Sequence, residues 1–289
     1  MQQLKLISLQ QPIFHLEQTA ETGPAPTALR LLVQTGDHFT GFLVYDAATR
    51  RVCRWMVLPA DLHQNSYPAT EWHLQSSGAL SWLQSVSFEK IHIISYTARS
   101  TAVPAGLTNG LQPELFTDLM LGNKTGEIRL QDAVSEQSMV RYYTCAAPLH
   151  HSLQNLFPGA AWQHVQSCYM QQEPAVQPQL RVSVYFNQVL VTAEANRQWL
   201  LSQTYEYHTP EDLLYHILKC MEELQLDAAT TPVFVDGFLE LHSPLASILQ
   251  QYLAQLSYQQ TELFQFPAGK EEEQNHTLAL ADRILTCVS

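Results

Sequence analysis

The sequence has little charge, and most of that charge is negative. Charged residues make up 15% of the 289 positions, with 15 basic against 27 acidic side chains and a formal net charge of −12. Affinity for nucleic acid depends on Lys and Arg side chains that displace counterions from phosphates. The composition therefore argues against nucleic acid as a partner, and against an anionic membrane surface for the same reason.

Long hydrophobic runs and paired cysteines are also missing. No stretch approaches the roughly 18 apolar residues that cross a bilayer, so we expect no membrane insertion. The first residues hold one Lys and no sustained apolar run, which predicts neither a signal peptide nor an anchor. Scattered cysteines without metal-ligand spacing predict reduced, buried thiols and a cytoplasmic location. These cysteines are Cys53, Cys145, Cys168, Cys220 and Cys287.

The clearest pattern that is present runs from Leu180 to Leu226. Leu180–Phe186 alternates apolar and polar residues, as a half-buried strand does. Two further short strands are predicted before a helix that opens with Thr209 as its cap and Pro210 at its first position. The helix carries its apolar residues on one stripe. They are Leu213, Leu214, Ile217, Leu218, Met221 and Leu224.

The same order of elements is predicted in the first half of the chain. Three strands recur, with Trp55 standing where Trp199 stands later, and a helix is expected between Ala69 and Val86. In each half a buried strand and a helix that opens with proline follow. The predicted strands of the first half are Leu29–Val33, Gly41–Tyr45, Val52–Leu58 and Lys90–Tyr96, and the fourth strand of the second half is Pro232–Gly237. The later helices are Pro113–Leu121, Pro244–Leu256 and Glu271–Cys287, with a last strand at Glu262–Phe266.

This doubled order predicts an α/β protein with two ribonuclease-H-like lobes. A strand between two helices joins its sheet in parallel through a right-handed crossover, so each lobe should be a mixed sheet flanked by helices. Two such lobes in tandem suit an actin-like ATPase arrangement. We expect the first lobe at 1–175 and the second at 176–289, with an inserted segment near 124–173. Within the insertion the pattern predicts a strand at Met139–Cys145, a helix at Leu149–Phe157 and a strand at Trp162–Met170.

Short motifs resemble those of a known family. They are the run Tyr96–Pro104, the Leu156-Phe157-Pro158 followed by His164, and the doubled hairpins. Together they are similar to an uncharacterised bacterial family of unknown function, a resemblance that covers nearly the whole chain. The resemblance implies an actin-like ATPase fold and assigns no activity.

The phosphate-gripping residues of such a fold are largely missing. An acid, one residue and then a glycine are expected in the first hairpin of each lobe, so that the acid handles a hydrated metal ion and backbone amides reach phosphate. Gln34 stands at the acid's position in the first lobe. The remaining cleft candidates for binding a nucleotide are Gly36, Asp37, Asp236 and Gly237. Ordinary turn and strand-end roles explain all four residues more simply.

Other catalytic chemistries lack their residues as well. A nuclease of this fold needs carboxylates in the first strand of a lobe, and Leu29–Val33 and Leu180–Phe186 contain none. No serine-hydrolase elbow is present. The 12 histidines show no HxxxH or HExxH spacing, which a metal site on a helix would use. The nearest approach to a histidine cluster is His150, His151, His164, His208 and His216, for which capping, surface and core roles are the simpler interpretation.

The sequence therefore favours a non-catalytic protein that works as a cytoplasmic binding or scaffold module. We expect no catalytic residue, no metal and no cofactor, and a protein partner that the sequence does not identify. A special case is an adaptor whose partner adds a strand to a sheet edge. The alternative is a degenerate nucleotide-binding ATPase or kinase-like protein with an altered site between the lobes. The oligomeric state is not specified by the sequence.

Overall fold

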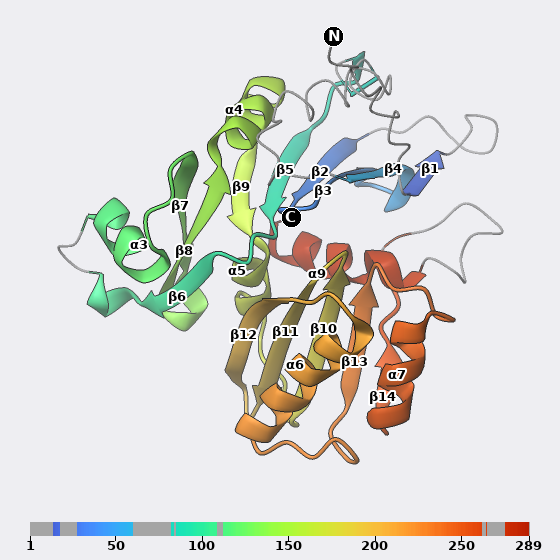
Figure 1. Ribbon diagram of the computed structural model, residues 1–289. Coiled ribbons are helices and arrows are strands. Elements are labelled where there is room, and N and C mark those ends of the chain that lie inside the picture. Colours follow the sequence, from blue (N-terminus) through green and yellow to red (C-terminus); the bar gives the residue numbers. More distant parts are fainter. Residues whose placement is uncertain are drawn as a thin grey trace, which may run out of the picture. The chain divides into compact units, whose positions relative to one another are not determined.

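The computed structural model (Figure 1) describes residues 14–17, 28–59, 82–83, 85–108, 112–261, 264 and 275–288. Contacts within the chain divide it into two compact units, which are described separately. The expected lobe boundary near residue 175 stays a prediction. The first unit comprises Met1–Tyr96, Asn123–Leu130 and Thr144–Gln163, and the second comprises Thr97–Gly122, Gln131–Tyr143 and His164–Ser289.

The first unit is built on a mixed sheet with the strand order β1-β4-β3-β2-β5-β9. Its first hairpins are antiparallel, and β2 and β5 pair in parallel. The edge strand β1 is not among the strands predicted from the sequence, and it pairs antiparallel with β4. The strands are β1 (Phe14–Glu17), β2 (Leu29–Thr35), β3 (Phe39–Asp46), β4 (Arg51–Pro59), β5 (Lys90–Ser95) and β9 (Ala161–His164).

The second unit contains a five-stranded sheet in the order β12-β11-β10-β13-β14. β10, β11 and β12 form an antiparallel meander, while β13 and β14 add in parallel. A two-residue turn joins β11 to β12, with φ of 52° at Asn196 and 59° at Arg197, as suits a tight hairpin. The strands are β10 (Gln179–Tyr185), β11 (Gln188–Ala195), β12 (Gln198–Glu206), β13 (Val233–Gly237) and β14 (Leu256–Tyr258).

The predicted duplication is confirmed by strand order and by a shared irregularity. Apart from β1, each sheet lists its strands as third, second, first, fourth and fifth along the chain. Each sheet also has a register shift that leaves the third residue of the third strand without a partner, Cys53 in β4 and Leu200 in β12. Counted from this bulge, Trp55 corresponds to Ser202. The expected equivalence of Trp55 and Trp199 is therefore wrong.

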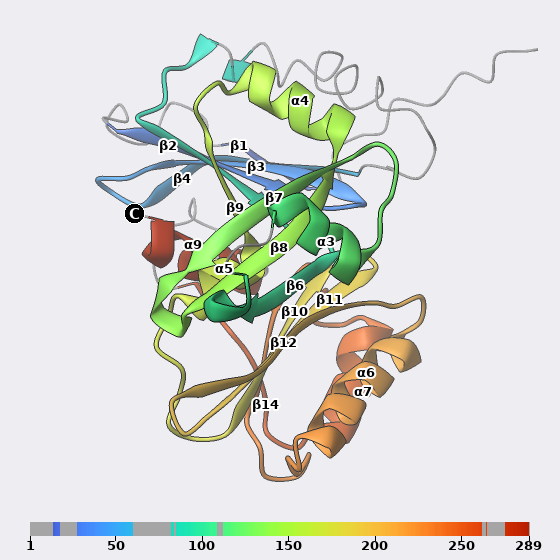
Figure 2. The same ribbon diagram turned by 90° about the vertical axis from the view of Figure 1, so that its left-hand side faces the viewer.

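The helices α6 and α7 cover one face of the second sheet (Figure 2). α6 (Pro210–Glu223) begins with the predicted cap, which is a full capping box because Thr209 and Asp212 bond each other's backbone N–H. α7 (Pro244–Tyr252) is capped by Ser243. Val182, Val184 and Val191 are fully buried beneath these helices. Alternation along the strands thus sends one set of side chains to this core and the other set to the opposite face.

In the first unit, α4 (Ala147–Leu156) packs against one face of the sheet (Figure 2). Its Leu149 and Leu153 lie one turn apart and are buried against the sheet residues Val33 and Phe42. The ring of Phe42 also meets Phe157, which ends the helix, with 6.5 Å between ring centroids. The helix expected at Leu149–Phe157 is confirmed. Most of the helix expected between Ala69 and Val86 lies outside the described residues.

A third, three-stranded sheet has the order β6-β8-β7 and carries α3. β6 pairs antiparallel with β8, and the predicted strand Met139–Cys145 is confirmed as β8. The boundary between the two units falls within β7 and β8. The elements are β6 (Ser100–Pro104), the short helix η2 (Ala105–Leu107), α3 (Pro113–Leu121), β7 (Glu127–Val134), the short helix η3 (Ser135–Gln137) and β8 (Met139–Ala146).

Two of the expected elements differ in the structure. The strand expected at Trp162–Met170 is β9 followed by a short helix, α5 (Val165–Met170), whose six residues are all buried. Continuous burial removes the periodicity that separates strand from helix. The helix expected to reach Leu256 ends at Tyr252, because Leu256–Tyr258 pairs with β13 as β14. The strand predicted at Glu262–Phe266 lies outside the described residues except for Phe264.

The chain's last described elements are η4 (Asn275–Leu278) and α9 (Ala279–Val288). They confirm a helix near the expected position, although its predicted acidic start at residues 271–273 is outside the described part. Cys145, Cys168 and Cys220 are buried and form no disulfide, as expected, and Cys53 is half-buried. Within the described ranges, no helix is both long enough and apolar enough to cross a membrane.

The glycine at the end of β13 is required by its neighbour in the sheet. Gly237 has a φ of +94°, and a Cβ placed on it would lie 2.2 Å from the backbone oxygen of Val184 on β10. Gly122, at the end of α3, also has a positive φ, of +74°, but a Cβ there would meet nothing within 4 Å. A side chain would strain the backbone at both positions, and the two positions differ in the space available to it.

We predict that Gly237→Ala lowers the free energy of unfolding by about 3 kcal/mol or more, since strain and a backbone clash add. Gly122→Ala should cost less, about 2 kcal/mol, from strain alone. Urea unfolding followed by circular dichroism measures both. Equal losses for the two variants would contradict the clash as the cause.

Candidate functional site

The first candidate turn joins β2 to β3 and holds Gly36 and Asp37. The backbone N–H of Gly36 donates to the carbonyl oxygen of Phe39 at 3.0 Å, so this amide is already used within the turn. A Cβ on Gly36 would lie 2.7 Å from the Phe39 ring. Asp37 follows in a bend and is half-buried. The glycine is therefore accounted for by the packing of Phe39 across the turn.

Gln34 occupies the position at which an acid was expected. It is buried, and its side-chain amide donates to the hydroxyl of Tyr96 at 2.7 Å. Tyr96 in turn packs its ring edge-on against Phe39, with centroids 5.4 Å apart. A neutral amide in this position fits a hydroxyl partner and supplies no charge for a metal ion.

The second candidate pair, Asp236 and Gly237, lies at the end of β13, an interior strand of the second sheet. Asp236 is fully buried, and its carboxylate forms an ion pair with the guanidinium of Arg283 from α9. Gly237 pairs with Val184 of β10, where only a glycine fits. The acid and the glycine thus both serve contacts inside the second unit.

Arg283 is itself held in place by aromatic and backbone contacts. Its guanidinium lies over the ring of Tyr169 from α5, 4.7 Å from the centroid. The hydroxyl of Tyr169 exchanges a hydrogen bond with Ser183 of β10 at 3.0 Å. The backbone oxygen of Arg283 accepts a bond from the side chain of Gln172. These contacts fix the cation beside the sheet, so the ion pair is a built feature of this layer.

Burial sets the electrostatics of this pair. Desolvation raises the pKa of Asp236 above its ordinary value, and the positive charge of Arg283 counteracts the rise. Burial works against the charge of Arg283, but Tyr169 and Asp236 raise its pKa overall. Because Arg283 already balances the carboxylate, a metal ion would have to displace it before it could bind Asp236.

Sequence reasoning missed a buried polar network in the second unit. The carboxylate of Asp132 on β7 accepts bonds from the backbone N–H of His164 at 2.6 Å and from the hydroxyl of Tyr143 at 3.1 Å. Desolvation raises the pKa of Asp132, and the bond from His164 opposes the rise. The available signal was weak, because Asp132 is one of several charged residues in a strand that also carries Glu127 and Arg129.

A buried arginine lies in the same network. Arg141 on β8 donates to the hydroxyl of Ser100 at 3.2 Å and, through a short bond, to the side-chain oxygen of Gln166. Gln166 then donates to Thr204 at 3.2 Å. Burial lowers the pKa of Arg141 to about 10, with Asp132 acting in the opposite direction. A charged residue in the otherwise apolar run of β8 was the sequence signal for this role.

His164 is a structural histidine at the start of α5. One ring nitrogen, Nε2, lies 3.0 Å from the carbonyl oxygen of Thr97, and the other, Nδ1, accepts from the backbone N–H of Gln166 at 3.2 Å. This pattern requires a neutral ring with its proton on Nε2. Burial, followed by the charge of Arg141, lowers the pKa of His164 to about 3. Both nitrogens are used, so neither is available to ligate a metal ion.

The other histidines of the sequence-based cluster are engaged separately. His150 packs on Trp162 with ring centroids 4.6 Å apart and lies beside His151 on α4. His216 stacks on Tyr205 at 4.7 Å and reaches the backbone oxygen of Glu206 at 3.1 Å. Across the described residues, no three His, Cys, Asp or Glu side chains gather as a metal site would require.

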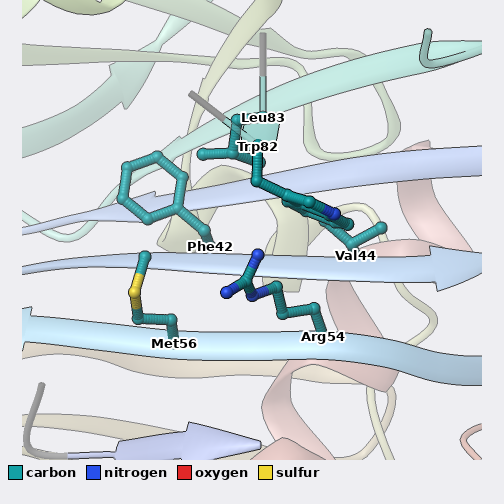
Figure 3. Close-up of a pocket in the computed structure, with 6 residues that line it drawn as sticks. All are labelled: Phe42, Val44, Arg54, Met56, Trp82 and Leu83. Carbon is teal, nitrogen blue, oxygen red and sulfur yellow. The ribbon is translucent and has the colours of Figure 1, made fainter. Parts of the chain in front are cut away.

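A small pocket in the first unit offers little chemistry (Figure 3). It encloses about 190 Å³, open solvent included, which is below the roughly 300–1,000 Å³ of most small-molecule sites. The guanidinium of Arg54 lies over the Trp82 ring at 4.5 Å and supplies the only charge among the lining side chains. The lining residues are Phe42, Val44, Arg54, Met56, Trp82 and Leu83.

The neutral state of His164 generates a pH dependence. In the unfolded chain His164 binds a proton near pH 6.5, whereas in the folded protein it does so only near pH 3. Its contribution to stability is therefore complete above pH 6.5 and is lost as the pH falls towards 3. Between pH 7.5 and 5.5 wild type should lose about 1.4 kcal/mol that His164→Asn does not lose.

Urea unfolding at the two pH values measures this difference, and any constant cost of the substitution cancels. Asn retains a capping side chain at the start of α5. His151→Asn, at an exposed position of α4, is the matched control and should follow wild type. Parallel losses in wild type and His164→Asn would show that the imidazole is not held neutral.

Comparison with solved structures identifies the fold. A protein from Bacteroides thetaiotaomicron VPI-5482, described as having an actin-like ATPase fold and unknown function, matches with a TM-score of 0.67 at 15% identity, covering 89% of this chain and 96% of that chain. The PilM–PilN type IV pilus biogenesis complex matches with a TM-score of 0.59 at 10% identity, covering 90% of this chain and 98% of that chain. The chain therefore has the actin-like ATPase fold that its doubled sequence pattern predicts.

Comparison of the sequence with curated proteins found no match. A family model does match, over residues 25–256, and it is described as a protein of unknown function, DUF3822. This match spans most of the chain, from before β2 to the first residue of β14, so the protein belongs to the DUF3822 family.

Proposed function

We propose that this protein is a non-catalytic binding or scaffold module on an actin-like ATPase fold, acting in the cytoplasm. One observation carries the proposal. The carboxylate of Asp236, the candidate acid of the second unit, is neutralised by Arg283 inside the protein. A nucleotide-dependent enzyme needs a carboxylate free to handle a hydrated metal ion.

The first unit supports the same conclusion. Gln34 replaces the acid expected before the turn, and its amide is bonded to Tyr96. The amide of Gly36 donates to Phe39 and so is not directed at a phosphate. Phosphate cradles work by presenting several unused backbone N–H groups to the ligand. These contacts of Gln34 and Gly36 therefore support a role for the β2–β3 turn other than phosphate binding.

A protein partner is the most consistent ligand class. The formal net charge of −12 disfavours nucleic acid. The similar PilM structure is that of a complex with PilN, so a chain with this fold engages another protein there. We infer that this protein likewise acts by binding a protein partner, without a cofactor or metal.

The competing function is a degenerate nucleotide-binding ATPase or kinase-like protein. The actin-like ATPase fold itself favours it. Its binding residues would be the cleft candidates Gly36, Asp37, Asp236 and Gly237. Of the two acids, Asp37 is the one that keeps partial exposure.

Calorimetric titration of the full chain with ATP and Mg²⁺ separates the two functions. We expect a Kd weaker than about 1 mM, equivalent to about 4 kcal/mol of binding free energy, and no release of phosphate. Tighter binding, or turnover that Asp37→Asn abolishes and the surface variant Glu173→Gln preserves, would establish the competing function. Asp37→Asn suits this test because it changes a half-buried turn and leaves the core intact.

A further inference from the structure

The chain runs back and forth between its two compact units. Three segments of each unit alternate along the sequence, so the chain passes from one unit to the other five times. On the side of the second unit, these passages begin or end at Thr97, Gly122, Gln131, Tyr143 and His164. Segments so far apart in sequence open independently unless shared contacts join them.

A buried carboxylate joins three of the passages. Asp132, the second residue of its segment, is 8% exposed. Its Oδ2 accepts a hydrogen bond from the backbone N–H of His164 at 2.6 Å, and its Oδ1 accepts one from the hydroxyl of Tyr143 at 3.1 Å. The rings of Tyr143 and His164 also meet, with centroids 5.0 Å apart. Hydrogen bonds to a buried carboxylate are among the stronger ones in proteins, so these passages are tied at one group.

His164 extends the connection to the other two passages. Its Nε2 lies 3.0 Å from the carbonyl oxygen of Thr97, which is buried. The Oγ1 of Thr97 accepts a bond from the backbone N–H of Arg99 at 3.2 Å. The guanidinium of Arg99 then donates to the carbonyl oxygen of Gly122 at 3.1 Å. One continuous set of bonds, made by groups of the second unit alone, therefore reaches all five passages.

We propose that these groups form a junction clamp through which the five passages open in a single cooperative step. The clamp is defined as Thr97, Arg99, Asp132, Tyr143 and His164. Proteins open locally in cooperative units, each with a free energy of its own below that of global unfolding. The clamp is such a unit, with Asp132 as its central acceptor. This inference goes beyond the proposed function, because it concerns the joining of the chain's segments and requires no partner.

Burial gives the physical reason for joint opening. Asp132, Tyr143 and His164 are 8%, 1% and 0% exposed, so none of them has water to replace a lost partner. Opening one passage alone would leave a buried donor or acceptor unpaired in another passage. Such an unpaired group costs more free energy than an ordinary hydrogen bond contributes. Separate opening is therefore penalised, and joint opening is favoured.

Native-state hydrogen exchange of the full chain, read at single residues by NMR, tests the clamp. Three backbone N–H groups donate directly to its side chains and are called the clamp amides. They belong to Arg99, to His164 and to Gln166, which donates to the Nδ1 of His164 at 3.2 Å. After correction for intrinsic rates, we expect the three to exchange within about threefold of one another, because they share one opening step.

A tyrosine pair supplies the variant and its matched control. Tyr143→Phe deletes one bond to Asp132 and keeps the ring, and it should speed exchange of all three clamp amides by about tenfold or more. Tyr169 is equally buried in the same unit, and its hydroxyl shares a hydrogen bond with Ser183 at 3.0 Å. Tyr169→Phe should leave the clamp amides unchanged.

A second variant acts from the rim of the clamp, where folding is not at risk. Arg99 is half-buried, and Arg99→Met removes its bond to Gly122. Because the bond is exposed, the effect should be smaller, about threefold. It should nevertheless appear at the amides of His164 and Gln166, to which the lost bond does not belong. That remote effect distinguishes a shared opening step from local loosening.

Several results would overturn the proposal. Unequal exchange of the clamp amides in wild type would show that the passages are held separately, as would acceleration by Tyr143→Phe at only one of them. An effect of Tyr169→Phe as large as that of Tyr143→Phe, or no remote effect of Arg99→Met, would also contradict it. Leu180, whose N–H donates to Pro232 at 2.9 Å, reports on the five-stranded sheet. Exchange of Leu180 at the rate of the clamp amides would show global unfolding and no separate clamp.

Discussion

The second unit depends on a charge that is buried and balanced at its centre. Asp236 lies at the end of β13, completely shielded from solvent, and an isolated carboxylate in such a place would be prohibitively costly. Arg283 offsets that cost, and the stack on Tyr169 holds Arg283 in position. Because Arg283 belongs to α9 and Tyr169 to α5, one electrostatic requirement ties both helices to the sheet.

In this chain the fold is present, but the residues that could carry nucleotide chemistry have structural partners. Asp236 and Gly237 have the identities that a nucleotide site would use, yet each has a structural reason to be what it is. The acid pairs with Arg283, and the glycine admits the backbone of β10. In the first unit, Gln34 likewise serves a hydrogen bond to Tyr96, and Gly36 leaves room for the ring of Phe39. Residue type alone is therefore a poor guide to ligand binding in this chain.

The local parts of the fold were predictable because their causes are local. Alternation along Leu180–Phe186 and the cap at Thr209 depend on neighbouring residues alone, and both are confirmed. The partnership of Asp236 with Arg283 spans 47 positions of sequence, and no pattern announces it. α5 was missed because a fully buried segment has no periodicity, and β1 because its pairing with β4 exists only in the folded sheet. For the candidate site residues, the sequence predicted their places in a turn or at a strand end. It did not predict which residues of the chain they contact.

The bulge shared by the two sheets bears on how this molecule avoids unwanted association. β12 is an edge strand of nine residues, and its stretch from Gln198 to Tyr205 carries no charged side chain. A flat edge of that kind is a template on which foreign strands polymerise. Leu200 interrupts the ladder near its start, and the added local twist turns the strand away from a straight pairing geometry. The irregularity that the two sheets share therefore makes this edge a poorer template for strand addition than a regular strand would be.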